Sequence, residues 1–460
     1  MEKDSTKKFT FRTGSPVLIL LALPLLCVGF DFFYGSRVPF NRWMQYFTSS
    51  GDEFRAVDKE DEMFRFRLGR LVRGDDRRSL ETTGFACDRT YHSVVCVSNR
   101  PARIATGNMT VYIPSDEDSD RVTVARPYAR QEDELKVIGE VRMYQYSNTT
   151  APPECRRTHG VPAVIFSSGS TGNVFHEMNE IVIPLYITAR QFRRRVQFIL
   201  EDYKPSFMAK YGKVVTRLTE FDVMNPAAEN GSVHCFPAGA VVGLKYHDNL
   251  AVNSSDIPGG YGMTEFRRFL RQAYGLKFSH VSQIPKPKLI LLSRTNTRRF
   301  LNEEELISTM ERVGFRVILV KRSKLVSNLN IFSRLVNSGS VLVGAHGAGL
   351  TNEIFLPTGA VMIQVELLGT DWASDTYYGD TARAMGVRYL RYKIEPEESS
   401  LAKLYGLNHS VVRDPGSVYR TGGYRAARTV FLDQQNVRLN LTRFEETLVE
   451  ALSIVTDWSE

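Results

Sequence analysis

Short apolar runs alternate with stretches of helical pattern throughout the second half of the chain. The apolar runs have the length of buried strands. Strands are predicted at 288–294, 315–322, 340–346, 360–367 and 387–394, and helices from Asn302 and at 327–338, 349–356 and 375–385. Asn302, with Glu305 three residues later, has the spacing of a capping box. This alternation predicts a parallel, doubly wound α/β domain.

The first half contains a strand, a turn, a helix and a strand in succession, at 161–168, 169–173, 174–192 and 195–202. In such a βαβ unit the first loop opens at a helix N-terminus beyond a strand's carboxyl end, where open α/β sheets bind ligands. His176 and Glu177 fall in the first turn of this helix, facing that cleft, and are the candidate catalytic residues. The alternative interpretation is a capping Glu and a packed His.

The N-terminus predicts a membrane anchor. A basic leader, residues 1–15, precedes an apolar segment at 16–36. A cleaved signal peptide is the alternative, but no A-x-A site follows, which favours an anchor. Positive charge ahead of the segment keeps the N-terminus in the cytosol and sends the rest into the lumen. Residues 37–80 are rich in Arg, Asp and Glu and are interpreted as a stem.

Length and charge add little to this picture. The 460 residues suggest two domains, assigned to 81–284 and 285–400, with a final segment at 401–460 whose helical pattern predicts that it packs back. A composition that is 43% hydrophobic excludes a disordered or collagen-like chain. The net charge of +8 is interpreted as scattered surface charge, and no nucleic-acid partner is expected.

Cysteines and sequons support a luminal location. Four of the five cysteines lie outside the apolar segment and are able to form two disulfides: Cys87, Cys96, Cys155 and Cys235. Cys87 and Cys96 are the expected local pair, and buried free thiols are the alternative. Six N-x-S/T sites are present, at Asn108, Asn148, Asn230, Asn253, Asn408 and Asn440. They indicate the secretory pathway.

The segment GAHGAGLTN at 344–352 joins the third strand of the second domain to its helix. Its glycines permit close backbone approach, and free N–H groups at the helix start favour a diphosphate. Glu366, at the end of the next strand, is placed to bind a ribose. NAD would also fit this spacing, but NAD chemistry is uncommon in the lumen, which favours a nucleotide sugar. The candidate donor-binding residues here are His346, Gly347, Gly349, Leu350, Thr351, Asn352 and Glu366.

Arg294, Arg298 and Arg299 follow the first strand of the same domain. A guanidinium there can neutralise a leaving diphosphate without a metal. Surface charge is the alternative for Arg298 and Arg299, and His346 is either a phosphate donor or a core residue. The D-x-D triplet within 115–120 lies in a charged run and is interpreted as a solvated loop, so no metal ligand is predicted. The turn at 169–173 lacks the G-x-S-x-G pattern, which disfavours a hydrolase.

Several ordered segments make the chain resemble glycosyltransferase family 61, in particular its plant branch that adds arabinofuranosyl or xylosyl groups to xylan. They are PYAR at 127–130, TGNVFHEMNEIVIPLY at 171–186, VHCFPAGAVVGLKYH at 233–247, PGGYGMTEFRRFLRQAYGL at 258–276, LLSRTNTRRFLNEEEL at 291–306, GAHGAGLTNEIFLPTGAVMIQVE at 344–366 and FLDQQNVRLNLTRF at 431–444. Where the family has F-H-D, this chain has Phe175, His176 and Glu177.

The resemblance implies two facing Rossmann-like domains (GT-B), a single-pass type II Golgi membrane protein, and inverting transfer from a UDP-sugar with no cofactor or metal required. It further implies a UDP-pentose donor, a xylan acceptor and complexes with other Golgi glycosyltransferases. Alternatives are transfer of xylose or N-acetylglucosamine to a glycoprotein, a luminal UDP-sugar-binding protein without activity, and an NAD-dependent enzyme.

Overall fold

The computed structural model describes residues 52–90, 93–131, 137–147, 151–169, 172–247, 249–255, 257, 260–321 and 327–457. By its contacts the chain divides into two compact units, 1–60 and 61–460, and the second unit holds the three sheets of a mixed α/β fold. The expected anchor at 16–36 lies outside the described residues. Within those residues, no helix combines the length and apolarity needed to span a bilayer.

The predicted stem is partly folded. Helices α3 (Asp52–Gly69) and α4 (Gly74–Thr83) occupy much of it. Phe64, Leu68 and Leu71 recur at helical spacing and are fully buried, as is Leu80. The folded body therefore begins before residue 81, because this short apolar stripe lies among charged residues that dominate the local composition.

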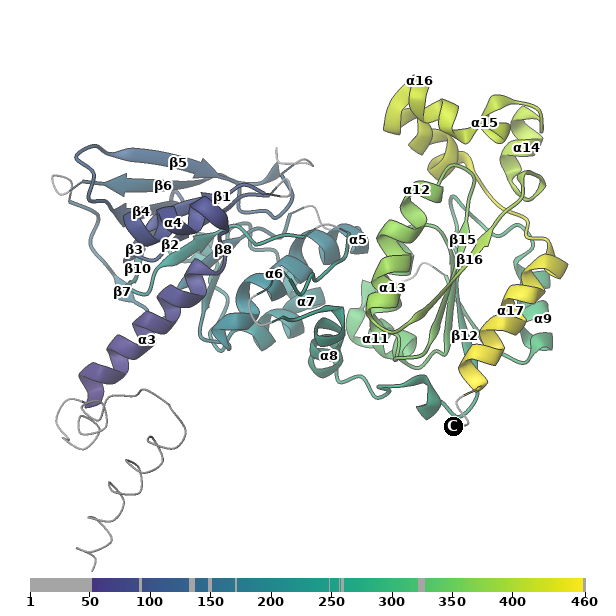
Figure 1. The fold of residues 1–460 in the computed structure, drawn as a ribbon, viewed down its shortest axis with the longest axis horizontal. Coiled ribbons are helices and arrows are strands. Elements are labelled where there is room, and N and C mark those ends of the chain that lie inside the picture. Colours follow the sequence, from purple (N-terminus) through teal and green to yellow (C-terminus); the bar gives the residue numbers. More distant parts are fainter. Residues whose placement is uncertain are drawn as a thin grey trace, which may run out of the picture. The chain divides into compact units, whose positions relative to one another are not determined.

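The first half of the body contains a mixed five-stranded sheet (Figure 1). Its order is β1 (Phe85–Asp88), β2 (Val95–Ser98), β11 (Ala240–Val242), β8 (Ala163–Phe166) and β9 (Gln197–Leu200). Strands β11, β8 and β9 run parallel, whereas β1 and β2 form an antiparallel edge. The βαβ unit β8–helix–β9 has the predicted order.

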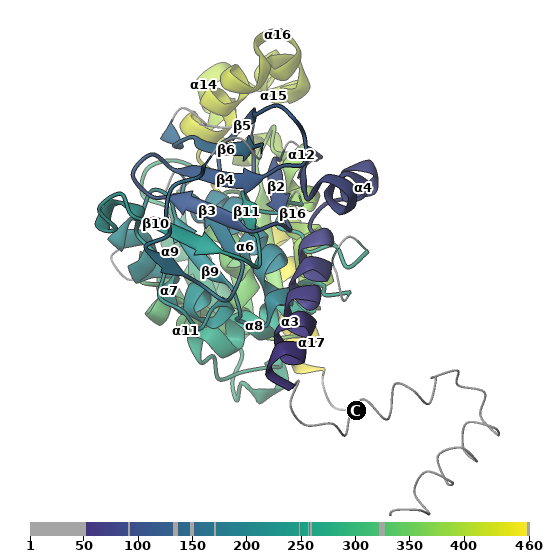
Figure 2. The ribbon, with the colours of Figure 1, turned by 90° about the vertical axis from the view of Figure 1, so that its left-hand side faces the viewer.

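A six-stranded sheet packs against this one. Figure 2 shows most of its strands in sequence, and the order is β5 (Arg121–Ala125), β6 (Val141–Tyr146), β4 (Thr110–Pro114), β3 (Ala102–Ala105), β10 (Val233–Phe236) and β7 (Arg157–Thr158). Side chains along β8 alternate between two buried clusters: Val164 and Phe166 pack in the larger, Ala163 and Ile165 in the smaller. The smaller cluster joins residues of both sheets. One face of the mixed sheet is thus covered by strands, where a Rossmann-like domain would have helices.

Helices cover the opposite face. The predicted helix at 174–192 is continuous but irregular: α5 (Val174–Glu177), a π-helical turn (Met178–Val182), α6 (Ile183–Ala189) and a 3-10 turn (Arg190–Phe192). Helices α7 (Pro205–Leu218) and α8 (Met263–Tyr274) follow, and they pack on each other. Disulfides join Cys87 to Cys96, across β1 and β2, and Cys155 to Cys235.

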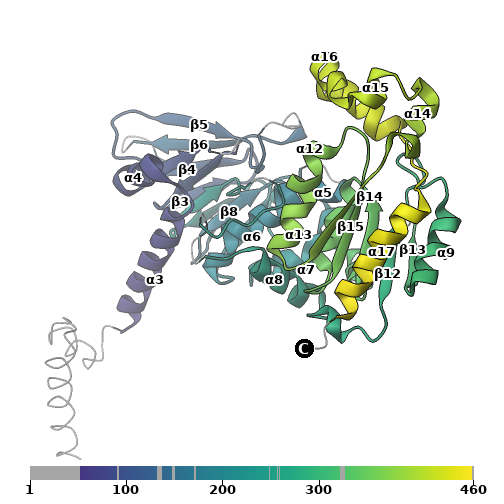
Figure 3. The same ribbon diagram turned by 45° about the vertical axis from the view of Figure 1, so that its right-hand side comes forward.

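The second half contains a fully parallel five-stranded sheet, as predicted. Its order is β13 (Arg316–Val320), β12 (Lys288–Leu292), β14 (Val341–Ala345), β15 (Val361–Glu366) and β16 (Arg388–Lys393). Numbered along the chain this is 2-1-3-4-5, a doubly wound order. Figures 1 and 3 show α9 (Glu303–Val313) and α17 (Leu441–Thr456) together on one side of the sheet, and α13 (Asp380–Ala384) on the other.

The remaining elements complete this half. They are α11 (Leu329–Asn337), a 3-10 helix η6 (Ala348–Phe355), α12 (Asp371–Ser374) with a π-helical turn (Asp375–Gly379), α14 (Ser400–Tyr405), α15 (Ser410–Arg413) and α16 (Pro415–Ala427). The predicted capping box at Asn302 is wrong. The Asn302 side chain instead donates to Leu439 O (2.9 Å) and accepts from Leu439 N (3.1 Å), so it ties α9 to the segment before α17.

Candidate functional site

The strand order of the parallel sheet has its switch point between β12 and β14. These strands are neighbours, but the chain leaves β12 toward α9, which packs with α17, and leaves β14 toward η6, which packs with α11 and α8. Where consecutive connections part to opposite faces, the carboxyl ends of the strands form the usual ligand site of an open α/β sheet. The predicted arginines follow β12 and the glycine-rich turn follows β14, so the structure brings both to this point.

Two guanidinium groups converge on Gly347. This residue has φ +144°, and a Cβ placed there would lie 2.7 Å from Arg298 Nη1 and 3.1 Å from Arg294 Nη1. Only glycine therefore allows the turn and the two cations to approach this closely. Arg298 Nη1 donates to the His346 carbonyl (3.0 Å), and Arg294 Nε donates to Thr297 O (3.0 Å).

Arg298 is a partly buried cation beside this turn. It has no carboxylate within 4 Å among the residues that the structure describes, and its buried Nε has no hydrogen-bond partner. Burial, and then repulsion from Arg294, lower the pKa of Arg298 to about 10, so it remains charged at neutral pH. The two neighbouring cations, Arg294 and Arg298, would be stabilised by an anion between them.

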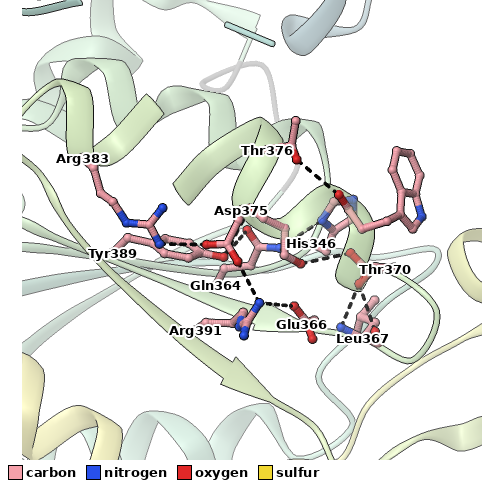
Figure 4. A network of polar contacts seen from close by, with 12 residues as sticks. His346, Gln364, Glu366, Leu367, Thr370, Asp375, Thr376, Arg383, Tyr389 and Arg391 are labelled. Carbon is pink, nitrogen blue, oxygen red and sulfur yellow. Dashed lines mark hydrogen bonds and ion pairs between the residues drawn. The ribbon is translucent and has the colours of Figure 1, made fainter. Parts of the chain in front are cut away.

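His346 is a neutral core residue at the base of this turn. Burial, then Arg298 and Arg294, lower the pKa of His346 to about 3. Gln364 Nε2 lies 3.1 Å from His346 Nδ1 and also donates to Ser374 Oγ (2.8 Å), as Figure 4 shows. Because the amide nitrogen donates, Nδ1 accepts and the ring proton sits on Nε2. His346 is therefore a donor without charge.

The other predicted donor-site residues differ in accessibility. Leu350, Thr351 and Asn352 are buried, and Asn352 Nδ2 donates to Gly349 O (2.9 Å), so these three support the turn from within. Glu366 is 1% exposed and lies 3.6 Å from Arg391, which pairs with Asp375 (2.8 Å; Figure 4). A ribose would meet Glu366 only after displacement of its neighbours.

His176 is paired with a carboxylate that sequence reasoning missed. Its Nδ1 lies 2.6 Å from Glu180 Oε1, one helical turn further on. Glu180 is 1% exposed and also accepts from the Tyr128 hydroxyl (2.6 Å), while Arg130 lies 4.0 Å away. This contact places the ring proton on Nδ1 and leaves Nε2 as the basic nitrogen. The i, i+4 spacing on one helix was the signal available in the sequence.

Glu177 is enclosed by partners. It is 2% exposed; Oε1 accepts from Gly172 N (3.0 Å), and Oε2 accepts from Tyr211 Oη (2.7 Å) and pairs with Lys210. These contacts tie the loop before α5 to α7. They are the contacts of a structural carboxylate, whereas the His176 side chain is about two-fifths exposed.

The two predicted parts of the site lie side by side. Helix α5 packs against η6, so the turn that carries His176 adjoins the glycine-rich turn. The ring of Phe175 lies 4.9 Å from that of Tyr377 and 6.2 Å from that of Tyr378, and Tyr378 packs on His346 (5.7 Å). The His176 imidazole and the two guanidinium groups are thus held on adjoining turns by aromatic packing.

The acidic segment at 115–120 and the sequons can also be located in the structure. In the 115–120 segment, Asp116 pairs with Arg100 and Asp120 accepts from Ser147 N (2.8 Å). Among the sequons, Asn148 lies outside the described residues and Asn253 is half-buried, while the other four asparagines are exposed: Asn108, Asn230, Asn408 and Asn440.

Residues 174–363 match the family described as Glycosyltransferase 61. The chain is 37% identical over 376 residues to the alpha-1,3-arabinosyltransferase XAT3 of Oryza sativa subsp. japonica, covering 80% of this chain and 64% of that relative. It is 34% identical to the beta-1,2-xylosyltransferase XYXT1 of the same organism, over 72% of each chain.

The xylan glycosyltransferase MUCI21 of Arabidopsis thaliana is 32% identical over 401 residues, 82% of this chain and 80% of that protein. The family match at 174–363 includes both α5 and the glycine-rich turn. This extent of identity, over chains of comparable length, shows that the chain belongs to glycosyltransferase family 61.

Proposed function

We propose that this protein transfers a pentose, arabinofuranose or xylose, from a UDP-sugar to xylan with inversion at the anomeric carbon. The observation that carries the proposal is the convergence of Arg294 and Arg298 on Gly347, in the turn beside α5. The substrate class follows from the arabinosyl- and xylosyltransferase names of the relatives. Because the chain covers only 64% of XAT3, the acceptor is part of the proposal.

The donor diphosphate would lie against the two guanidinium groups and the backbone of the glycine-rich turn. One guanidinium group can donate hydrogen bonds to two phosphate oxygens at once. These cations would stabilise the negative charge that builds on the leaving UDP as the bond between the sugar and the diphosphate breaks. Because His346 is neutral, it does not repel the two arginines and adds no charge to the site. With cations placed in this way, the proposed reaction requires neither metal nor cofactor.

His176 is the proposed general base, and Glu180 is its positioning residue. Nε2 of His176 removes the proton of an acceptor hydroxyl, whose oxygen forms a bond to the anomeric carbon. The bond between that carbon and the diphosphate oxygen breaks, and UDP leaves with the electron pair. Glu180 stabilises the imidazolium that forms, and the carboxylate of Glu177 holds the loop before α5.

The proposal includes a GT-B arrangement, with 81–284 and 285–400 as the acceptor-side and donor-side domains. The doubly wound parallel sheet and the βαβ unit at β8 support it. The proposed setting is a type II Golgi membrane protein with an anchor at 16–36 and a luminal body, which the two disulfides and the exposed sequons favour. Complexes with other Golgi glycosyltransferases belong to the same proposal.

A donor screen tests this function. The full chain is incubated with UDP-xylose or UDP-arabinofuranose and a neutral xylo-oligosaccharide, and the product is analysed by mass spectrometry and NMR. One pentose should be added, with an anomeric configuration opposite to that of the donor. The His176→Ala variant should lose at least about 100-fold in rate. Transfer at the wild-type rate by this variant would remove His176 from the mechanism, and absence of any pentose product would contradict the function.

A further inference from the structure

A second pocket lies away from the proposed reaction centre. It has a volume of about 620 Å³ and is formed by the ends of α6 and α7 together with α8. Helices α5 and α6 lead from the carboxyl end of β8 back to the amino end of β9, and α7 returns from β9 to the same edge. The pocket therefore lies at the amino edge of the mixed sheet, whereas His176 lies at its carboxyl edge.

The pocket is strongly cationic. Five basic side chains and one carboxylate line it: Arg190, Arg194, Lys213, Arg217, Arg268 and Glu265. This excess of positive charge is half of the formal charge of the whole chain. Basic side chains held together in a concave surface raise the local concentration of anionic ligands.

These cations lack acidic partners. Within the described part of the chain, none of the five has a carboxylate within 4 Å, although ion pairs are common elsewhere in the molecule. Two of them donate to neutral groups: Arg194 to Thr219 O (3.5 Å) and Arg217 to Gln272 Oε1 (3.2 Å). The only carboxylate, Glu265, accepts from Gly262 N (2.9 Å) at the start of α8.

The backbone is strained where it enters the pocket. Arg193 and Arg194 both have positive φ, 51° and 72°. Long side chains rarely adopt this conformation. It occurs between the 3-10 turn and β9, where Arg194 lines the pocket.

The pocket also has aromatic surface. Tyr186 and Phe269 line it but are buried, so the accessible aromatic surface is the half-buried ring of Tyr261, one face of which lies 5.4 Å from the Arg190 guanidinium. Aromatic faces pack against the C–H surface of sugar rings, while exposed arginine and lysine side chains bind carboxylates. A compact phosphate would need only the cations, whereas a carboxylated sugar would use both features.

We infer that this pocket binds an acidic glycan, with uronate carboxylates on the cationic side chains and a sugar ring against Tyr261. The inference rests on the proposed action on a polysaccharide: the pocket would hold a uronate-bearing part of the acceptor far from the residue that is modified. It would increase affinity for acidic acceptor chains and leave transfer to short neutral ones unchanged.

The test compares two matched sugars, a xylo-oligosaccharide with one uronic acid side group and the same compound with its carboxyl reduced to the alcohol. Binding to the full chain is measured by calorimetry at low ionic strength. The wild type should bind the acidic sugar at least about tenfold more tightly, and added salt should weaken this preference. Equal binding of the two sugars would overturn the inference.

Two variants locate the site. The triple variant Arg194→Gln, Lys213→Gln, Arg217→Gln should lose the preference for the acidic sugar. Tyr261→Leu should weaken binding of both sugars. The control variant Lys403→Gln, Arg413→Gln, Arg425→Gln removes the same charge from exposed positions far along the chain and should behave as wild type. An unchanged preference in the pocket variant, or an equal loss in the control, would overturn the inference.

Two further arms separate alternatives. Vesicles with anionic phospholipid should not compete with the acidic sugar; efficient competition would mean that the pocket binds membrane lipid instead, and so would overturn the inference. Transfer to a neutral xylo-oligosaccharide is measured in parallel, and the pocket variant should retain it. If the wild type itself shows no transfer, the proposed function fails, while the binding comparison still decides the pocket.

Discussion

Two neighbouring glutamates on one helix illustrate how residue type and spacing can mislead. His176 and Glu177 were predicted because they begin a helix at a ligand-binding edge. The structure gives Glu177 three polar partners and burial, whereas Glu180 contacts the imidazole. Position in the first turn could be predicted from the sequence. The partners of each carboxylate could not, because Tyr128, Lys210 and Tyr211 reach them only through the tertiary fold.

The variants Glu180→Gln and Glu177→Gln should therefore have different effects, the first on catalysis and the second on stability. Glu180→Gln should lower kcat by about 10- to 1,000-fold with a small change in KM for the donor, because a neutral amide no longer stabilises the imidazolium. Glu177→Gln should instead lower the free energy of unfolding by about 2 kcal/mol or more, because Lys210 loses its buried partner. Urea unfolding and steady-state kinetics of both variants check this. The same pattern of loss in both variants would contradict the separate roles.

His346 predicts a pH dependence of stability. Its folded pKa is lowered to about 3, so the folded state does not take up this proton until far below pH 6.5, the ordinary value, whereas the unfolded state does. Stability should therefore fall as the pH decreases from 6.5 toward 3, by about 3 to 5 kcal/mol from this group. Urea unfolding at successive pH values should show a steeper decline for the wild type than for His346→Gln. Parallel curves would contradict the assignment.

At the level of elements, the parallel sheet could be predicted almost strand by strand. Its central strands β12, β14 and β15 are largely buried on both faces, the edge strands β13 and β16 less so, and all five appear as separate runs between turns or helices. The first half was harder. Strands β8 and β9 are equally apolar, but a burial pattern does not reveal whether a helix layer or a second sheet covers the far face, and here the six-stranded sheet does.

The glycine-rich turn offers a matched pair of substitutions. Gly347→Ala should weaken UDP binding by at least about tenfold, because the added methyl would meet Arg298 and because φ is positive. Gly349→Ala should stay within about twofold of wild type, because the nearest atom to its new methyl, Leu292 Cδ1, is 3.6 Å away. Calorimetric titration with UDP measures both. Equal affinities for the two variants would show that the approach of the arginines to Gly347 is unimportant.

At the level of the whole molecule, the order of the second sheet places residues from separate loops together. Arg294 and Arg298 were predicted as candidates without any measure of their distance from the glycine-rich turn. That distance depends on β12 and β14 being neighbours, which alternation along the chain does not specify. The basic pocket was missed for the same reason, because its side chains come from several helices and the segments next to them.

Arg298 and its neighbours are proposed to bind the diphosphate of a UDP-sugar. Titration calorimetry with UDP tests this binding most directly. Arg298→Gln should weaken UDP binding by about 10- to 100-fold, the usual worth of a charge-assisted hydrogen bond to phosphate. Arg299→Gln, which alters an exposed side chain next to it, is the control and should bind as wild type does. UDP binding of wild-type strength by Arg298→Gln would contradict the account.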